Sequence, residues 1–322
     1  MTFGKLMRAI AGGSDKYYMT TQPLAEDETG PLALHAAPVT QLQEDFPARP
    51  RLLGNLVPHQ YNLWVGNSPD GTSSGLHHDF HDNLYVLCRG RKRFSLFAPS
   101  EHAALALTGK VHRVHANGLI NFDGLETRED GAHPTTLAED RVARAEARLA
   151  EDDSEAARDE LEAAEDALDE LVGFNFGDED EDEDEDDGSA GQGRASKRRR
   201  TEDKAKDAPL PDNFCKTSEV DGKAAVRVDV DVRAGEMLFL PASWFHEVTS
   251  FSSAGGHIAF NYWMHPARHG APFDAPYEDD FWARRYAQLS KAGAGAAKSA
   301  AQPAAVADKS VSDADYFASV LP

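Results

Sequence analysis

Two stretches decide the fold class: NLYVLCRGRKRFSLFA at residues 83–98 and VRVDVDVRAGEMLFLP at residues 226–241. In the first, two short apolar runs flank a turn at Gly90, which predicts a β-hairpin. In the second, VRVDVDV alternates strictly and predicts a half-buried strand, and EMLFL predicts another strand after the turn at Gly235. Short strands separated by turns are typical of an all-β sandwich or jelly roll.

The remaining apolar segments fit this class. HIAFNYW at residues 257–263 predicts a further strand. Residues 277–289, with aromatic residues at Phe281, Trp282 and Tyr286, predict a helix that packs on the core or on a second subunit. The Ala-rich stretch at 291–307 predicts a loose linker. We therefore expect a mainly β protein whose helices lie at its ends.

The acidic charge of the chain is concentrated in one insert. The sequence has 33 basic and 55 acidic residues, a net charge of −22. Residues 137–171 hold 14 acids and 4 arginines, and residues 178–187 (DEDEDEDEDD) are all acidic. Because these segments account for most of the net charge, the acidity belongs to the insert and not to a binding surface of the fold. The net negative charge argues against a general nucleic-acid-binding protein, which needs a basic surface.

The insert has three parts. Leucines at helical spacing predict a solvated helix or helical hairpin over 137–171. The acidic run at 178–187 cannot bury apolar surface, so we expect it to be disordered. The run KRRR at Lys197–Arg200 fits two interpretations, a nuclear-import signal or a linker that balances the acidic run.

The composition also indicates the cellular compartment in which the protein is expected. The two cysteines, Cys88 and Cys215, cannot form a disulfide framework or a Cys-rich zinc module. No run of 18 apolar residues is present, so we expect no membrane span, and residues 1–18 lack the apolar run of a signal peptide. These features predict a reducing, soluble location that is cytoplasmic and/or nuclear.

The densest cluster of potential ligands is LHHDFHDN at residues 76–83. Residues two apart on a strand face the same way, so His77 and Asp79 project together while His78 points away. His246, in PASWFHEV after a strand and a proline turn, is the candidate third ligand. Two histidines and one carboxylate leave open positions that suit Fe(II), a bidentate co-substrate and dioxygen. His-x-Asp alone is a common structural pattern, and His246 alone would fit a core histidine, so the prediction rests on the combination.

Three strings resemble the Jumonji-C or cupin-8 type of 2-oxoglutarate-dependent hydroxylases. They are LHHDFHDNLYVLCRGRKRFSLFAPSE (76–101), RAGEMLFLPASWFHEV (233–248) and HIAFNYW (257–263). The second is most similar to the Jumonji-C lysyl hydroxylases, which modify protein side chains. The resemblance implies a double-stranded β-helix (jelly roll, cupin) with flanking helices and a long, partly disordered insert. Relatives usually have a longer helical region before the tyrosine strand than the residues that precede Tyr18 here.

The resemblance also implies site residues. His77, Asp79 and His246 match the iron ligands, which are the catalytic centre. Lys92 matches the lysine that pairs with the distal carboxylate of 2-oxoglutarate, and a buried dicarboxylate does need a cation. Four further positions match contacts to the co-substrate: Asn83, Ser74, Tyr18 and Asn261. Ser74 stands where the family often has threonine, and it keeps the hydroxyl group but lacks the methyl group.

The implied activity is hydroxylation of a protein side chain by Fe(II), 2-oxoglutarate and dioxygen, with succinate and CO2 as co-products. Three alternatives stay open: a transfer-RNA base hydroxylase of the wybutosine type, a histone lysine demethylase, and a non-catalytic cupin-fold binding protein. The first lacks a basic RNA surface beyond the KRRR run. The second lacks a recognisable cage for a methylated cation and reader modules. The complete triad together with Lys92 argues against the third.

The domain prediction follows from these segments. The cupin domain is expected in two parts, residues 1–136 and 216–290, separated by the insert at 137–215 and followed by an Ala-rich tail at 291–322. We expect a protein substrate and no membrane or nucleic-acid partner. Relatives often dimerise through C-terminal helices, so a homodimer is a further expectation.

Overall fold

The computed structural model describes residues 1–27, 30–31, 33–175, 210–218, 225–296 and 307–308. The chain divides into two units, residues 1–131 with 208–322, and residues 132–207. The acidic run and Lys197–Arg200 lie outside the described residues, as does most of the 291–322 tail. In the described residues, no helix has the length and apolar character needed to cross a membrane.

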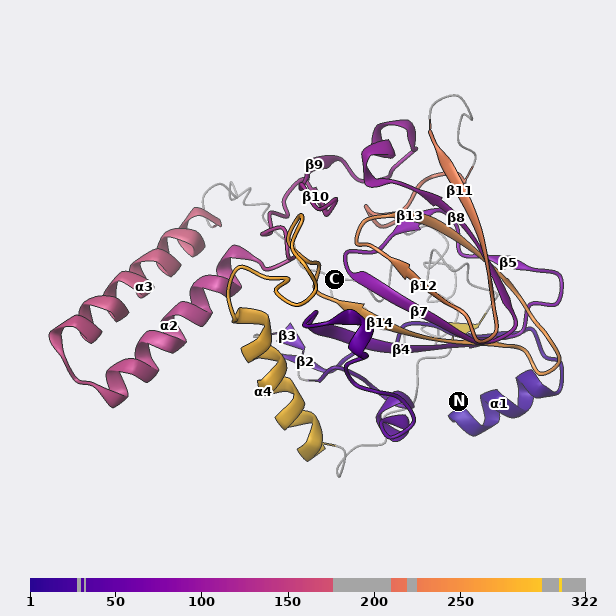
Figure 1. Cartoon of the computed structure of the whole chain (residues 1–322), viewed down its shortest axis with the longest axis horizontal. Coiled ribbons are helices and arrows are strands. Elements are labelled where there is room, and N and C mark those ends of the chain that lie inside the picture. Colours follow the sequence, from indigo (N-terminus) through magenta and orange to yellow (C-terminus); the bar gives the residue numbers. More distant parts are fainter. Residues whose placement is uncertain (28–29, 32, 176–209, 219–224, 297–306, 309–322) are drawn as a thin grey trace, which may run out of the picture. The chain divides into compact units, whose positions relative to one another are not determined.

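Two antiparallel sheets build the first unit (Figure 1). In spatial order, the larger sheet contains β12 (Met237–Leu240), β7 (Asp82–Arg89), β14 (His257–Met264), β4 (Pro58–Gly66), β1 (Tyr17–Met19) and β15 (Ala307–Asp308). The smaller contains β11 (Arg227–Arg233), β8 (Arg91–Phe97), β13 (Phe245–Phe251) and β5 (Thr72–Ser73), and β6 (His77–His78) also pairs with β13. The expected mainly β jelly roll is confirmed.

Shorter elements surround the sheets. They are α1 (Phe3–Ala11), α4 (Phe281–Ala296), the paired strands β2 (Glu26–Asp27) and β3 (Gly30–Pro31), the paired strands β9 (Val111–Val114) and β10 (Ile120–Phe122), and the 3-10 turns Val39–Leu42, Arg51–Leu53 and Pro99–Ala104. Helix α4 confirms the predicted C-terminal helix, and its first two residues, Phe281 and Trp282, are buried. It continues to Ala296, so the start of the stretch predicted as a loose linker is helical.

The core has a layer on each side of the larger sheet. Between the sheets, Tyr85 and Leu87 of β7 belong to one cluster with Phe94 and Leu96 of β8. On the other face, strand residues such as Tyr262 form a second cluster with Leu6 and Ile10 of α1. Strand β14 pairs with both β7 and β4, and its sequence HIAFNYWM is nearly continuously apolar. Burial on both faces accounts for that sequence, since neither face meets water.

The predicted hairpin at residues 83–98 is wrong. Strand β7 pairs with β12 and β14 in the larger sheet, whereas β8 pairs with β11 and β13 in the smaller one. The turn at Gly90 therefore carries the chain from one sheet to the other. Gly90 has φ +86°, and a Cβ there would lie 2.6 Å from the carbonyl oxygen of Phe251. The short turn that resembled a hairpin signal is a crossing in which only glycine fits.

We expect Gly90→Ala to lower the free energy of unfolding by about 2 to 5 kcal/mol, from left-handed strain plus the contact with the Phe251 backbone. Gly235→Ala is the matched control, because Gly235 has φ +88° and its added Cβ would meet open space. That variant should lose only the conformational part, about 1 to 2 kcal/mol. Urea unfolding of both variants measures the difference, and equal losses would contradict the crowding at Gly90.

The second unit contains α2 (Pro134–Glu151) and α3 (Glu155–Asn175), which pack as a helical hairpin (Figure 1). The helical prediction for residues 137–171 is confirmed. The end of the predicted insert differs from the structure, however. Phe214 and Cys215, placed in the insert from sequence, are buried in the first unit, Cys215 in a cluster with Leu76 and Phe245, and Phe214 against the His77 ring. Their segment is too short and too close to the charged run to show a strand pattern.

Candidate metal centre

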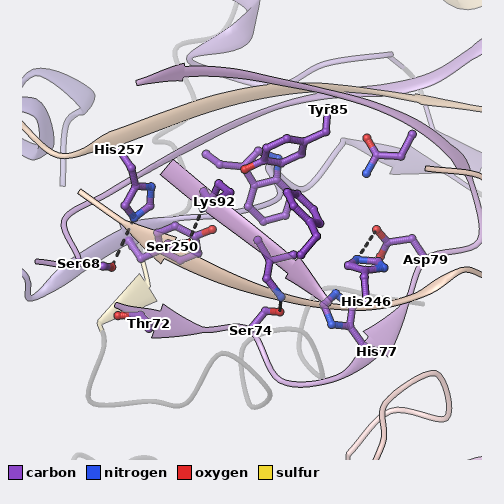
Figure 2. Close-up of a pocket in the computed structure, with 15 residues that line it drawn as sticks. Ser68, Thr72, Ser74, His77, Asp79, Tyr85, Lys92, His246, Ser250 and His257 are labelled. Carbon is purple, nitrogen blue, oxygen red and sulfur yellow. Dashed lines mark hydrogen bonds and ion pairs between the residues drawn. The ribbon is translucent and has the colours of Figure 1, made fainter. Parts of the chain in front are cut away.

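The three predicted ligands meet in the structure. His77 on β6 and His246 on β13 are register partners, and Asp79 follows β6 directly. The His77 and His246 ring centroids are 4.4 Å apart, and His246 Nε2 lies 3.6 Å from Asp79 Oδ2. One ligand atom from each residue lies within 4.8 Å of the other two. Figure 2 shows the three side chains together at one end of a pocket. As alternation predicts, His78 lies on the other side, against Phe122 and Phe245.

Backbone carbonyl groups orient both imidazoles. His77 Nδ1 lies 3.0 Å from the carbonyl oxygen of Gly75, and His246 Nδ1 lies 2.9 Å from that of Trp244. Each Nδ1–H can donate to its carbonyl group, which leaves Nε2 as the atom with a lone pair for a metal. Phe214 stacks on the His77 ring with centroids 4.7 Å apart and limits its rotation. These orienting contacts were not predictable from the sequence.

Burial keeps His77 in the neutral form that can bind a metal. It lowers the pKa of His77 well below the usual value, so the ring is neutral near pH 7. Burial also raises the pKa of Asp79, and the neighbouring His246 acts in the opposite direction. A divalent cation between these groups would favour the ionised carboxylate, because an adjacent positive charge stabilises that form.

A cationic side chain lies at the other end of the pocket. Lys92 of β8 is 1% exposed, and its Nζ donates to Ser250 Oγ at 2.5 Å and lies 5.9 Å from the centroid of the Tyr18 ring. Lys92 and Ser250 are register partners, as are His77 and His246, so β13 contributes one residue to each end. Four residues along a strand span about 13 Å between α-carbons. The long side chains reach inward from these points and leave space for a short ligand (Figure 2).

The other predicted residues divide into two groups. Tyr18, Ser74 and Asn83 line the same pocket as the triad and Lys92. The Ser74 hydroxyl donates to the Gly75 carbonyl and accepts from the Val248 amide, so it also links the Ser74 segment to β13. Asn261 contacts the pocket through residues that line it. It donates to Asn83 Oδ1 at 3.0 Å and accepts from Trp64 Nε1 at 2.8 Å. Asn261 therefore holds the wall in position.

Comparison with known proteins identifies the family. The model of the Cupin-like domain family matches residues 1–269 of this chain. JmjC domain-containing protein 4 of Schizosaccharomyces pombe (strain 972 / ATCC 24843) is 37% identical, with 87% of this chain and 71% of the relative aligned. The chain belongs to the cupin-like JmjC family. The predicted family resemblance is therefore confirmed, and the jelly roll described above is the JmjC cupin fold.

Several pocket residues of this JmjC domain were not predicted. Tyr85, Phe94, Val248 and Ser250 line the pocket. Each is two or four residues along a strand from Asn83, Lys92 or His246, so alternation alone could have found them. Trp64 and His257 also line the pocket, and His257 Nε2 lies 3.4 Å from Ser68 Oγ. These two depend on the register between β4 and β14, which the sequence does not reveal.

Proposed function

We propose that this protein is an Fe(II)- and 2-oxoglutarate-dependent oxygenase that hydroxylates a side chain of a protein substrate. The observation that carries the proposal is one pocket with a 2-His-1-carboxylate cluster at one end and a buried lysine at the other. Membership of the cupin-like JmjC family supports it.

The donor set fits Fe(II). His77, Asp79 and His246 would hold the metal on one face, which leaves the pocket side open for a co-substrate and dioxygen. A structural zinc site would more often have four protein ligands, commonly including thiolates. Cys215 is buried but is not a member of this cluster of described residues. Bound iron would supply the activation of dioxygen that couples decarboxylation of 2-oxoglutarate to oxidation of the substrate.

The chain's own residues would bind and orient the co-substrate. Lys92 would pair with the far carboxylate of 2-oxoglutarate, and the Ser250 hydroxyl holds the lysine in place. The aromatic rings of Tyr18 and Trp64 lie 6.3 Å apart at the pocket wall, where they would exclude water from the carbon chain. Orientation and desolvation of this kind are what a protein adds to cofactor chemistry.

The proposal of a protein substrate rests on the string at 233–248, which resembles the lysyl hydroxylases among JmjC proteins. A transfer-RNA base is the second candidate, since the insert carries the basic KRRR run at Lys197–Arg200. The negative charge of the whole chain disfavours it.

Turnover of 2-oxoglutarate with fractionated cell extract tests the proposal. We expect purified protein with Fe(II) to form succinate faster when the protein fraction is added, and protease treatment of that fraction should remove the stimulation. Incubation under 18O-labelled dioxygen should place one labelled oxygen atom on a side chain, detected by peptide mass spectrometry. Stimulation by the RNA fraction that nuclease removes would favour the transfer-RNA alternative, and release of formaldehyde would favour demethylation. Succinate formation that no fraction stimulates would contradict a macromolecular substrate.

A further inference from the structure

A second group of three histidines lies outside the pocket. His59 is on β4, His81 immediately precedes β7, and His265 immediately follows β14. One ring nitrogen from each lies within 4.8 Å of the other two. The described residues that line the pocket do not include any of the three. We call this group the His59 cluster.

Sheet register explains why these residues meet. Strand β14 lies between β7 and β4, and Met264 pairs with Asp82 on one side and Pro58 on the other. The three histidines are therefore at the same end of three adjacent strands. The register between β14 and β4 shifts at Trp263/Met264, which leaves His59 as the extra residue of a β-bulge. Bulges re-aim a side chain, and this one brings His59 to the other two rings.

The rings of the His59 cluster are in contact. The centroids of His59 and His81 are 3.9 Å apart, those of His59 and His265 are 5.2 Å apart, and those of His81 and His265 are 6.0 Å apart. Trp282 of α4 stacks on His265. Burial lowers the pKa of His59 to about 4, so this imidazole is neutral and able to bind a metal near pH 7.

Nitrogen atoms that share a tetrahedral Zn²⁺ at about 2.1 Å are about 3.4 Å apart. The nitrogen atoms of the cluster lie within 4.8 Å of one another, so a bound ion would draw them closer by up to about 1.4 Å. The stacked His59 and His81 rings would also rotate so that their lone pairs converge on the ion.

We propose that His59, His81 and His265 bind a divalent transition-metal ion, with Zn²⁺ as the preferred ion, at a site separate from the iron triad. Three imidazoles with a fourth position open are a ligand set that zinc takes in proteins. The nearest carboxylate along the chain, Asp82, accepts hydrogen bonds from the backbone amides of Ala242 and Ala267. The cluster is thus an all-imidazole set, unlike the triad, whose carboxylate suits Fe(II).

Such an ion would connect three parts of the fold. It would join the strand ends of β4, β7 and β14, and through Trp282 it would fix the start of α4. His81 is two residues after Asp79, so the ion would also restrain the segment that carries the carboxylate of the triad. The expected role is structural support of the metal-binding edge, and it does not depend on the proposed oxygenase activity.

Zinc retention by the full chain with the triad disabled tests the proposal. The protein carrying His77→Ala and His246→Ala is first stripped of metal with a strong chelator and then loaded with Zn²⁺. Exchange into buffer with a weak chelator then removes Zn²⁺ that is loosely bound to the acidic run at 178–187. We expect it to retain about one zinc per chain, the stoichiometry of a three-imidazole site. Adding His59→Gln and His265→Gln should lower retention at least tenfold. Adding His102→Gln and His112→Gln instead is the matched control, because both residues lie outside the two metal-binding groups, and it should leave retention unchanged.

Two outcomes would overturn the proposal. The first is folded, triad-disabled protein that retains no zinc, and the second is equal retention after the His59 and His265 substitutions. If the added glutamines prevent folding, X-ray absorption of the zinc-loaded, triad-disabled protein replaces that comparison. Scattering from three imidazoles would support the His59 cluster, whereas scattering from carboxylate oxygens alone would assign the ion to acidic residues.

Discussion

Lys92→Met is expected to raise the concentration of 2-oxoglutarate at half-maximal turnover by about 10- to 150-fold. Charge-assisted hydrogen bonds to a buried carboxylate contribute about 1.5 to 3 kcal/mol, which corresponds to that range at 25 °C. Methionine keeps most of the length of the buried side chain and removes the ammonium group. The measurement is succinate formation as a function of 2-oxoglutarate concentration, with Fe(II) at saturation.

Arg93→Met is the matched control for the effect of charge. Arg93 is the next residue, its side chain is 51% exposed, and it pairs with Asp231 on the surface of the smaller sheet. Its loss changes the net charge equally but should leave the response to 2-oxoglutarate within about twofold, because exposed ion pairs are weak and screened. Circular dichroism confirms that both variants fold. An unchanged response in folded Lys92→Met protein would remove Lys92 from the co-substrate site.

His77→Phe is expected to lower 2-oxoglutarate turnover by about 100-fold or more, because loss of a direct ligand exceeds the 10- to 100-fold effects typical of outer-shell changes. The anaerobic protein should also lose the visible charge-transfer band that needs both Fe(II) and 2-oxoglutarate. Phenylalanine retains a ring of similar size against Phe214, so packing at this position is largely preserved.

His78→Phe is the control for ring substitution in the same strand. His78 is fully buried, but its ring faces Phe80, Phe122 and Phe245 on the side away from the pocket. This variant should keep both the absorption band and turnover. A band that survives in His77→Phe protein would place the iron elsewhere, for example at the His59 cluster.

The ligands of the candidate site could be predicted from the sequence, whereas the sheet to which each strand belongs could not. Period-two alternation was enough to place His77 and Asp79 on one face and His78 on the other, because that pattern is local to the strand. Spacing along β13 would also have found Ser250 from His246. The crossing at Gly90 was not predictable, since a hairpin and a passage between sheets use the same short glycine turn.

Residues that depend on strand register were missed. Trp64 and His257 enter the pocket because β14 pairs with β4, and His59 reaches its cluster through a bulge in that pairing. Asn261 is predicted as a co-substrate contact, and its hydrogen bonds connect Trp64 to Asn83, a role that depends on strand register. Pairings between segments about 200 residues apart leave no local mark on the sequence.

The pairing of β8 with β11 also has a consequence for biosynthesis. Arg227 pairs with Phe97, and the whole second unit is encoded between them. The entropy cost of closing such a loop rises by only about 0.6 kcal/mol for each doubling of its length, so the jelly roll tolerates the added unit. Its order of assembly is nevertheless constrained, because chains emerge from the ribosome N-terminus first. A nascent chain that has not passed β13 carries His77 and Asp79 without His246, so binding of a metal ion by all three residues would be a late event in the life of each new molecule.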